Sequence, residues 1–382
     1  GKRTHLSMMT DMTSMRSRTH WLLFGGVVLA YYAFMNFLYF KKHGWPSALG
    51  PDIWYFLAVA KGKQPLSFLD ISFWLVKPLA SFAPQTGFIV LNAASVALHT
   101  FSCLLVYHYL GKFLRADPLF RLSAALLFAV LPQNVLPSTA LFTHFTVAQP
   151  LLIVAVGRLL PWCLKGSKRP DPWGAICLIE TLIIGPEGWF LLFCLTGTAL
   201  SKRVDFPSLL QKVRCPPVIA VLLACILFGL AFPLLFSLWS WFALHVRGID
   251  LTWQRDILTG DLLPANPAVV FYGFHLVWLA TGAVALWKKR YLPALFILLF
   301  LTLSMRVGRA YYAVEMAGFA VLMAVLFQEP ALKKRWAVIF PALACWLLLF
   351  WFTAKKPFYT LPNMTRVANT IRSGAKPGDR IA

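Results

Sequence analysis

Residues 21–40 read WLLFGGVVLAYYAFMNFLYF, a run of 20 positions without a charged side chain. The hydrocarbon core of a bilayer is about 30 Å thick, and a helix needs about 20 apolar residues to cross it. The run is also too long for the apolar core of a signal peptide. It therefore predicts a membrane-spanning helix.

The rest of the chain has the same character. Of its 382 residues, 59% are hydrophobic and 13% are charged, whereas about 25% of the residues of a soluble domain are charged. The formal net charge of +22 does not indicate nucleic-acid binding, because the basic residues punctuate apolar runs instead of forming a patch on a soluble domain. The seven cysteines lie mostly inside these runs, without a disulfide or metal-binding spacing, and are interpreted as small buried hydrophobic residues.

Division of the chain at its polar breaks gives about 11 spans. The predicted fold class is therefore all-α: a polytopic membrane protein with a segment 1–20, a membrane domain 21–353 and a tail 354–382. The two short segments near residue 186 can also be taken together as one broken, re-entrant element, which leaves the later spans on the same sides. The approximate span cores are 21–40, 86–110, 119–134, 142–163, 173–185, 188–200, 218–245, 267–287, 291–305, 310–327 and 337–353.

Orientation follows from the Lys and Arg residues beside the spans, because these residues are enriched on the cytoplasmic side. Of the 36 Lys and Arg residues, 21 fall on one side, which is predicted to be cytoplasmic. The first segment is then inside and the tail outside. The absence of a targeting signal and the predicted position of the functional site on the outer side favour a bacterial inner membrane. The 21 residues are Lys2, Arg3, Arg16, Arg18, Lys112, Arg115, Arg121, Arg158, Lys165, Lys168, Arg169, Lys202, Arg203, Lys212, Arg214, Lys288, Lys289, Arg290, Lys333, Lys334 and Arg335.

The outer connections are unequal. The longest, residues 41–85, contains Asp52 and Trp54 and two apolar stretches, 56–63 and 73–82, that are predicted to lie along the membrane interface. A short outer turn contains Arg306 and Arg309. Two arginines there depart from the usual enrichment of basic residues on the cytoplasmic side. Because guanidinium groups match phosphate oxygens, this pair indicates an anionic partner such as a lipid phosphate.

Ionisable residues at membrane depth are functional candidates, because their burial there is costly. Glu187 is the best placed, since it lies in Gly185-Pro186-Glu187-Gly188-Trp189, where Pro and two Gly predict a broken helix. Broken membrane helices commonly line a polar cavity, and His144, near the outer start of the fourth span, can face the same cavity. The complete set is His99, His108, His144, Glu180, Glu187, His275 and Glu315.

Three segments together resemble the GT-C membrane glycosyltransferases. The stretch from Gly50-Pro51-Asp52-Ile53-Trp54-Tyr55 to Gly62, with Pro78 beyond it, is similar to the family's acidic first-loop opening. Residues 128–134 resemble the turn after its third span. Residues 305–317, with Arg306, Arg309 and Tyr311-Tyr312, resemble the Arg-Tyr segment of the protein O-mannosyltransferase and aminoarabinose-transferase branch.

The tail adds to the resemblance. Residues 363–382 look like the entry into the outer soluble domain that many of these enzymes carry. Two alternatives stay open: this branch lacks the domain, or the chain is truncated.

The resemblance implies transfer of a sugar from a polyprenyl-phosphate or polyprenyl-pyrophosphate donor to a lipid, glycan or protein acceptor on the outer face. Asp52 would be the general base of an inverting displacement. Arg306 and Arg309 would stabilise the departing phosphate, helped by Tyr311 or Tyr312. The residues assigned to the acceptor or an auxiliary role are Glu187, His144, Trp54 and Trp189. No cofactor is certain, and metal dependence stays open because the chain has no Asp-X-Asp triplet.

Each assignment has an alternative. Asp52 can be an ordinary helix N-cap, the arginines can extend to lipid head groups, and the tryptophans can form an interfacial belt. For the whole chain, the alternatives are a secondary transporter or lipid flippase and a non-catalytic subunit of a glycan-assembly complex. The chain shows no internal repeat of the kind that many transporters have.

Overall fold

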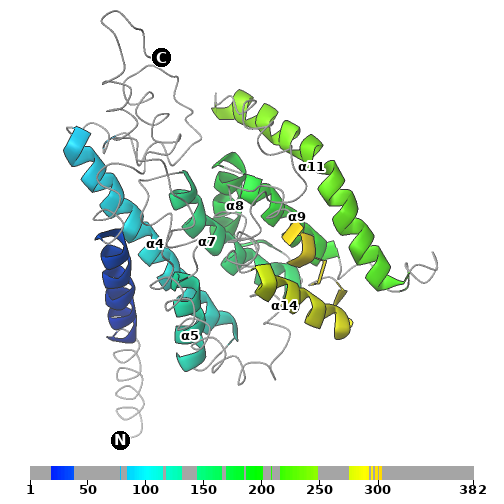
Figure 1. Cartoon of the computed structure of the whole chain (residues 1–382), viewed down its shortest axis with the longest axis horizontal. Helices are drawn as coiled ribbons and strands as arrows, with labels where there is room; N and C mark the ends of the chain where they lie inside the picture. Colours follow the sequence, from blue (N-terminus) through cyan, green and yellow to red (C-terminus); the bar gives the residue numbers. More distant parts are fainter. Residues whose placement is uncertain are drawn as a thin grey trace, which may run out of the picture.

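The computed structural model describes residues 19–37, 78, 84–114, 118–130, 144–165, 169–184, 186–200, 208, 216–247, 275–291, 294–295, 297–299 and 301–302. Within these residues the secondary structure is helical, without a strand (Figure 1). The Thr19–Phe37 helix is followed by α4 (Pro84–Leu114), α5 (Pro118–Val130), α7 (His144–Lys165), α8 (Pro172–Ile184), α9 (Pro186–Leu200), α11 (Pro217–Arg247) and α14 (His275–Trp287).

Proline marks most of the helix starts. It is the first residue of α4, α5, α8, α9 and α11, where its fixed φ suits a helix and its missing N–H group would have had no partner inside the helix. The predicted helix break is present, because α8 ends at Ile184 and α9 begins at Pro186. The predicted spans from 86 to 245 therefore correspond to described helices, and residues 131–134 of the predicted span 119–134 lie outside the described residues. The spans beyond 310 and the interfacial stretches of the first loop lie outside the described residues.

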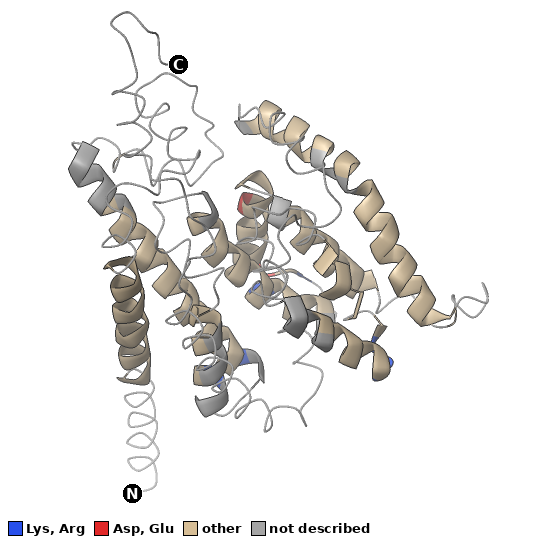
Figure 2. Ribbon diagram, in the orientation of Figure 1, with Lys and Arg blue, Asp and Glu red and all other residues tan. Residues whose placement is uncertain are grey.

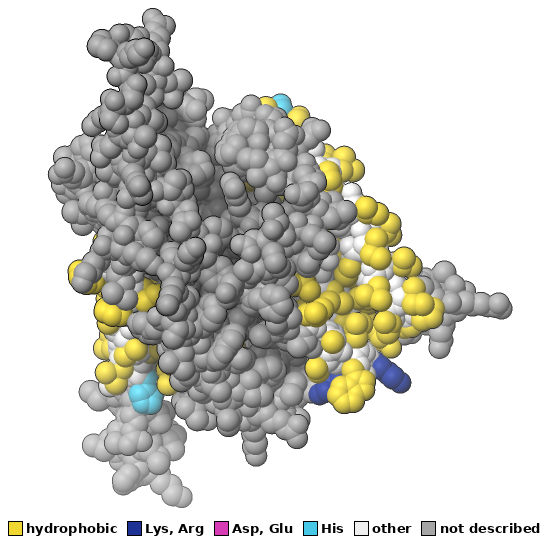
Figure 3. Space-filling view, viewed as in Figure 1, with side chains coloured by type: hydrophobic (Ala, Val, Ile, Leu, Met, Phe, Trp, Pro, Cys, Tyr) yellow, Lys and Arg dark blue, Asp and Glu magenta, His cyan; other side chains and the backbone are white. Residues whose placement is uncertain are grey.

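Three of the described helices are long and apolar enough to cross a membrane: Thr19–Phe37, Asn92–Lys112 within α4, and Thr146–Cys163 within α7. Large apolar side chains also face outward, among them Leu22, which is 77% exposed. The described hydrophobic side chains cover much of the surface over α11 and α14 (Figure 3), and charged residues are sparse along the helices (Figure 2). Such a surface suits lipid and not water, so the chain is a membrane protein.

Contacts fix how the helices run. The Thr19–Phe37 helix is antiparallel to α4, because Trp21 lies against Tyr107 at one end and Asn36 bonds to Asn92 at the other. By contrast, α7 runs parallel to α4, since Gly157 faces Tyr109 and Gln149 lies beside His99. Phe37, Pro84 and His144 therefore lie at one end of this bundle, which we call the Phe37 end.

The chain reverses after α14 through a Schellman motif. The N–H of Lys289 donates to the Leu286 carbonyl at 2.9 Å, and the N–H of Arg290 donates to the Ala285 carbonyl at 2.8 Å. Lys289 has a φ of 57°, at the position where glycine is usual. The turn brings Gly282 of α14 against Ile297 and Leu298.

Tyr32 joins three helices. Its side chain is fully buried, and its hydroxyl donates to the carbonyl oxygen of Ala129 at 3.0 Å and lies 3.4 Å from the Sγ atom of Cys103. Ala129 is in the last turn of α5, where carbonyls have no partner within the helix. The phenol of Tyr32 thus supplies the hydrogen bond that the end of α5 needs.

We predict that Tyr32→Phe destabilises the protein by about 1–3 kcal/mol, because the buried Ala129 carbonyl loses its donor. The adjacent Tyr31→Phe is the matched control, since the Tyr31 hydroxyl is buried without a hydrogen-bond partner among the described residues. Thermal unfolding in detergent should show a lower Tm for Tyr32→Phe and an unchanged or higher Tm for Tyr31→Phe. Equal Tm values for the two variants would contradict the assignment.

Candidate functional site

A group of polar side chains is buried between the Thr19–Phe37 helix, α4 and α7. We call this group the polar core. On α4, the spacing of Asn92, Ser95 and His99 places all three on one face of the helix. The members of the polar core, each at most 8% exposed, are Asn36, Asn92, Ser95, His99, Thr146 and Gln149.

Asn36 and Asn92 connect the first two helices of the core. The Nδ2 atom of Asn36 donates to Oδ1 of Asn92 at 2.6 Å. Asn36 lies one residue before Phe37, the last described residue of its helix, and Asn92 lies in α4, which begins at Pro84. The pair therefore joins the two described helices between which the sequence contains Asp52.

His99 is at the centre of the polar core. It is 2% exposed and is the only buried residue among the described His, Asp, Glu, Lys and Arg side chains. Its ring lies 6.2 Å from the ring of Tyr32, measured between centroids, and beside Gln149 of α7. Neither ring nitrogen has a partner of good hydrogen-bond geometry within the described part of the chain, although the Gln149 side chain lies close enough to interact with the ring. A buried imidazole in this state can bind a polar group or transfer a proton.

Pro150 interrupts the helical hydrogen bonding of α7 in the same region. It lies inside α7 and has no N–H group, so the carbonyl of Thr146 does not receive the usual helical hydrogen bond from residue 150. Thr146 and Gln149 are both buried.

The polar core is confined to the Phe37 end. Further along the same faces the buried side chains become apolar, with Val106 and Leu110 on α4 and Leu152, Val156 and Leu159 on α7. The hydroxyl groups of Thr100 and Ser102 bond to carbonyls of their own helix, so they add little polarity to the core. Any small polar ligand of this bundle is thus expected near the Phe37 end.

Helices α8 and α9 form a tight hairpin at the predicted break. The indole Nε1 atom of Trp189 donates to the Leu182 carbonyl at 3.1 Å, and its ring packs edge-on against Phe242 of α11 with centroids 5.4 Å apart. A Cβ atom at Gly188 would collide with the backbone of Thr181 and Leu182. Trp189 therefore holds the end of α8 and contacts α11, a structural use that the sequence did not indicate.

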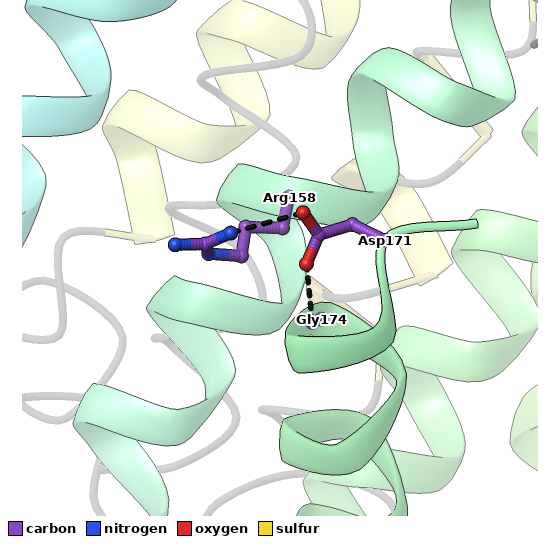
Figure 4. Close-up of polar contacts among 3 residues, drawn as sticks. All are labelled: Arg158, Asp171 and Gly174. Carbon is purple, nitrogen blue, oxygen red and sulfur yellow. Dashed lines mark hydrogen bonds and ion pairs between the residues drawn. The ribbon is translucent and has the colours of Figure 1, made fainter.

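Asp171 begins α8 as an N-cap (Figure 4). Its Oδ1 atom accepts a hydrogen bond from the N–H of Gly174 at 3.0 Å, and its Oδ2 atom accepts one from Nη1 of Arg158 at 2.9 Å. The Gly174 N–H and then the Arg158 guanidinium hold the pKa of the Asp171 carboxyl below its usual value. Arg158 is one of the basic residues predicted to lie beside the spans on the cytoplasmic side, but it lies inside α7, seven residues before the helix end.

The sequence-predicted site residues are described to different extents. Trp189 is 44% exposed, and its role toward an acceptor stays a prediction. His144 is the first residue of α7 and Glu187 the second of α9, but their side chains lie outside the described part. The residues wholly outside it are Asp52, Trp54, Arg306, Arg309, Tyr311 and Tyr312.

Sequence reasoning included His99 among seven ionisable candidates but did not select it. The spacing of Asn92, Ser95 and His99 was the available signal. A polar face on an otherwise apolar helix indicates a buried polar contact. Among the described residues, no group of three or more His, Cys, Asp and Glu side chains is arranged to hold a metal ion. Whether the activity depends on a metal ion held by the rest of the chain stays open.

Comparison with known proteins gives no relative: no family model matches the chain, and neither a curated protein nor a solved structure matches it.

We predict that Gly188→Ala destabilises the hairpin, because the added methyl group meets backbone atoms that cannot move aside as a flexible side chain can. Overpacking of this kind costs about 1–3 kcal/mol. Gly26→Ala is the matched control, since a Cβ atom there has no neighbour within 4 Å. The measurement is the temperature at which each detergent-solubilised variant loses monodispersity. A Gly188→Ala variant as stable as Gly26→Ala would refute this account of the hairpin.

Proposed function

We propose that the protein is a polytopic membrane glycosyltransferase of the GT-C type. It moves a sugar from a polyprenyl-phosphate or polyprenyl-pyrophosphate donor to a lipid, glycan or protein acceptor. In this proposal the chain has about 11 spans, the segment before Thr19 is cytoplasmic, and the active site faces the outside of a bacterial inner membrane.

The observation that carries the proposal is the confinement of the polar core to the Phe37 end. A sugar acceptor needs a polar environment, whereas the polyprenyl chain of the donor needs lipid. A bundle whose buried amides and imidazole lie at one end, followed by turns with mainly apolar buried side chains, suits such a pair of substrates. The Asn36–Asn92 pair supports the further step, because it joins the two described helices between which the sequence contains Asp52.

The proposed chemistry needs few groups. Asp52 accepts the proton of the acceptor hydroxyl as its oxygen attacks the anomeric carbon. The bond from that carbon to the donor phosphate oxygen breaks, and the phosphate leaves with the electron pair. Arg306 and Arg309, with Tyr311 or Tyr312, stabilise the charge on the leaving phosphate. His144, Glu187, Trp54 and Trp189 are assigned to the acceptor side.

The α8–α9 hairpin supports a second candidate, a transporter or flippase. α8 has 13 residues and is about 20 Å long at 1.5 Å per residue, which is short of the roughly 30 Å hydrocarbon core. Broken helices of this kind commonly line transport sites. Counterflow of a polyprenyl-linked sugar across liposomes without a covalent product would favour this candidate over the transferase.

We predict that Asp52→Asn lowers sugar transfer at least about 100-fold, because the amide cannot accept the proton. The assay follows release of labelled sugar from a set of polyprenyl-phosphate sugars, with membrane extracts or water as acceptor. Asp70→Asn, in the same loop, is the matched control and should retain activity. Wild-type turnover in Asp52→Asn would remove Asp52 as the base, and no turnover with any donor would favour the transporter or a non-catalytic subunit.

We predict that Arg306→Ala and Arg309→Ala each weaken donor binding about 10-fold or more, since a hydrogen bond to a charged phosphate is lost. Equilibrium binding of a fluorescent polyprenyl phosphate measures this effect. Arg255→Ala, in the predicted outer loop between spans 218–245 and 267–287, should bind the donor normally. Similar losses in all three variants would indicate a general effect of outer charge and would contradict a defined phosphate site.

A further inference from the structure

The exposed tryptophans of the described residues lie near helix ends. They are Trp173, Trp189, Trp241 and Trp287. Trp173 is the second residue of α8, Trp189 the fourth of α9 and Trp287 the last of α14, and Trp241 lies in the last two turns of α11. Indole rings concentrate where the hydrocarbon core meets the head groups, because they have an apolar body and a polar N–H group. The pattern is therefore typical of helices that end at a membrane interface.

One face of α11 is apolar over the thickness of a bilayer core. Its side chains recur every three or four residues and are each at least 48% exposed, in a region where hydrophobic side chains cover the described surface (Figure 3). From Ile219 to Leu238 the helix rises about 29 Å at 1.5 Å per residue, which matches a hydrocarbon core of about 30 Å. We call this face the α11 stripe, which consists of Ile219, Leu223, Leu227, Leu230, Leu234 and Leu238.

Trp241 and His245 continue the same face of the helix beyond Leu238. Trp241 is 62% exposed, and its ring centroid lies 4.4 Å from that of the exposed His245, with the ring planes inclined by 33°. The Nδ1 atom of His245 lies 2.7 Å from the Trp241 carbonyl oxygen. Since a carbonyl can only accept a hydrogen bond, Nδ1 carries the hydrogen, and Nε2 is the ring atom that can meet water or a head group. The apolar face thus ends in an aromatic and then a polar side chain.

The start of α9 lies at the level of Trp241. Trp189 packs edge-on against Phe242, the residue after Trp241, with ring centroids 5.4 Å apart. Its indole N–H donates to the Leu182 carbonyl, and its ring is still 44% exposed. Two exposed indoles on separate helices are therefore held at one level of the protein, which is the arrangement expected where helices cross the same interface.

We propose that the α11 stripe lies against phospholipid acyl chains and that Trp241 and His245 lie in the head-group region at one membrane interface. The length of the stripe matches the hydrocarbon core, and its Trp–His end matches the head groups. The level shared with Trp189 then puts the break between α8 and α9 close to this interface instead of in the middle of the bilayer. The inference holds whichever side of the membrane this end faces, and it does not depend on the glycosyltransferase activity.

The test is cysteine accessibility along α11 in the purified full chain, held in lipid nanodiscs so that a charged maleimide reaches both membrane faces. His245→Cys should be labelled at least about 10-fold faster than Leu234→Cys, because a thiol reacts as its thiolate, which apolar surroundings disfavour. Trp241→Cys should be labelled at an intermediate rate, since it marks the boundary. Peptide mass spectrometry assigns each label and separates it from labels on the native cysteines.

Ser240→Cys is the matched control, because Ser240 directly precedes Trp241 but is only 7% exposed. It should stay unlabelled, which would show that labelling follows the exposed face and not depth alone. Equal labelling rates of Leu234→Cys and His245→Cys would overturn the proposal, since the whole face would then be either in water or covered. Size-exclusion chromatography of each variant confirms that it is folded.

A second arm identifies what covers the α11 stripe. The photoreactive residue p-benzoylphenylalanine, placed at position 234, crosslinks on illumination to whatever lies against it, and the mass of the intact protein identifies the adduct. A phospholipid adduct is the expected result. A crosslink to another segment of this chain or to a second copy, without a lipid adduct, would overturn the proposal even if the labelling rates differ as expected.

Discussion

Helices in lipid gain little hydrophobic free energy by meeting one another, because the acyl chains are as apolar as their own side chains. Association then depends on close packing and on hydrogen bonds that lipid cannot supply. The contact between the Thr19–Phe37 helix and α4 contains both. Tyr32 satisfies a carbonyl at the end of α5, and the Asn36–Asn92 pair joins two amides that would otherwise be buried in hydrocarbon. The arrangement of the neighbouring helices depends on this contact.

Glycine residues provide the close packing between helices that accompanies these hydrogen bonds. Gly157 admits the ring of Tyr109, Gly174 lies against Arg158 and Leu159, and Gly188 lets α9 approach the backbone of α8. Each close approach brings a polar group to a defined place: the hydroxyl of Tyr109, the guanidinium of Arg158 and the indole N–H of Trp189. Small residues thus determine where polar atoms occur in a protein that has few of them.

Much of the fold could be predicted from local sequence. Apolar runs act within a few residues, so they predicted most described helices, and Pro186 with Gly185 and Gly188 predicted the break near residue 185. Pairings between distant residues could not be predicted in this way. Asn36 and Asn92 are 56 positions apart, and nothing local indicates that they meet. Arg158 resembled a loop charge because sequence alone does not show that Asp171 turns back to it.

The candidate site, like the fold, could be predicted from local sequence only in part. The burial of His99 among polar side chains required three helices to be placed, although its membrane depth was evident from the apolar residues around it. The assignments of Asp52, Arg306 and their neighbours depend on a family resemblance and on residues outside the described part of the chain. The bundle contributes a separate physical argument, which is the concentration of buried polarity at the end where the Asp52 segment is attached.

The short length of α8 has a consequence for the surrounding bilayer. A helix of 13 residues cannot match a hydrocarbon core of ordinary thickness, so the hairpin creates a hydrophobic mismatch unless neighbouring helices cover it or the bilayer thins around it. The exposed apolar surface of α11, which contacts the hairpin through Phe242, can supply part of that cover. Bilayer thickness therefore becomes a variable that acts on this protein, because a thicker membrane penalises the hairpin more than it penalises the full-length helices.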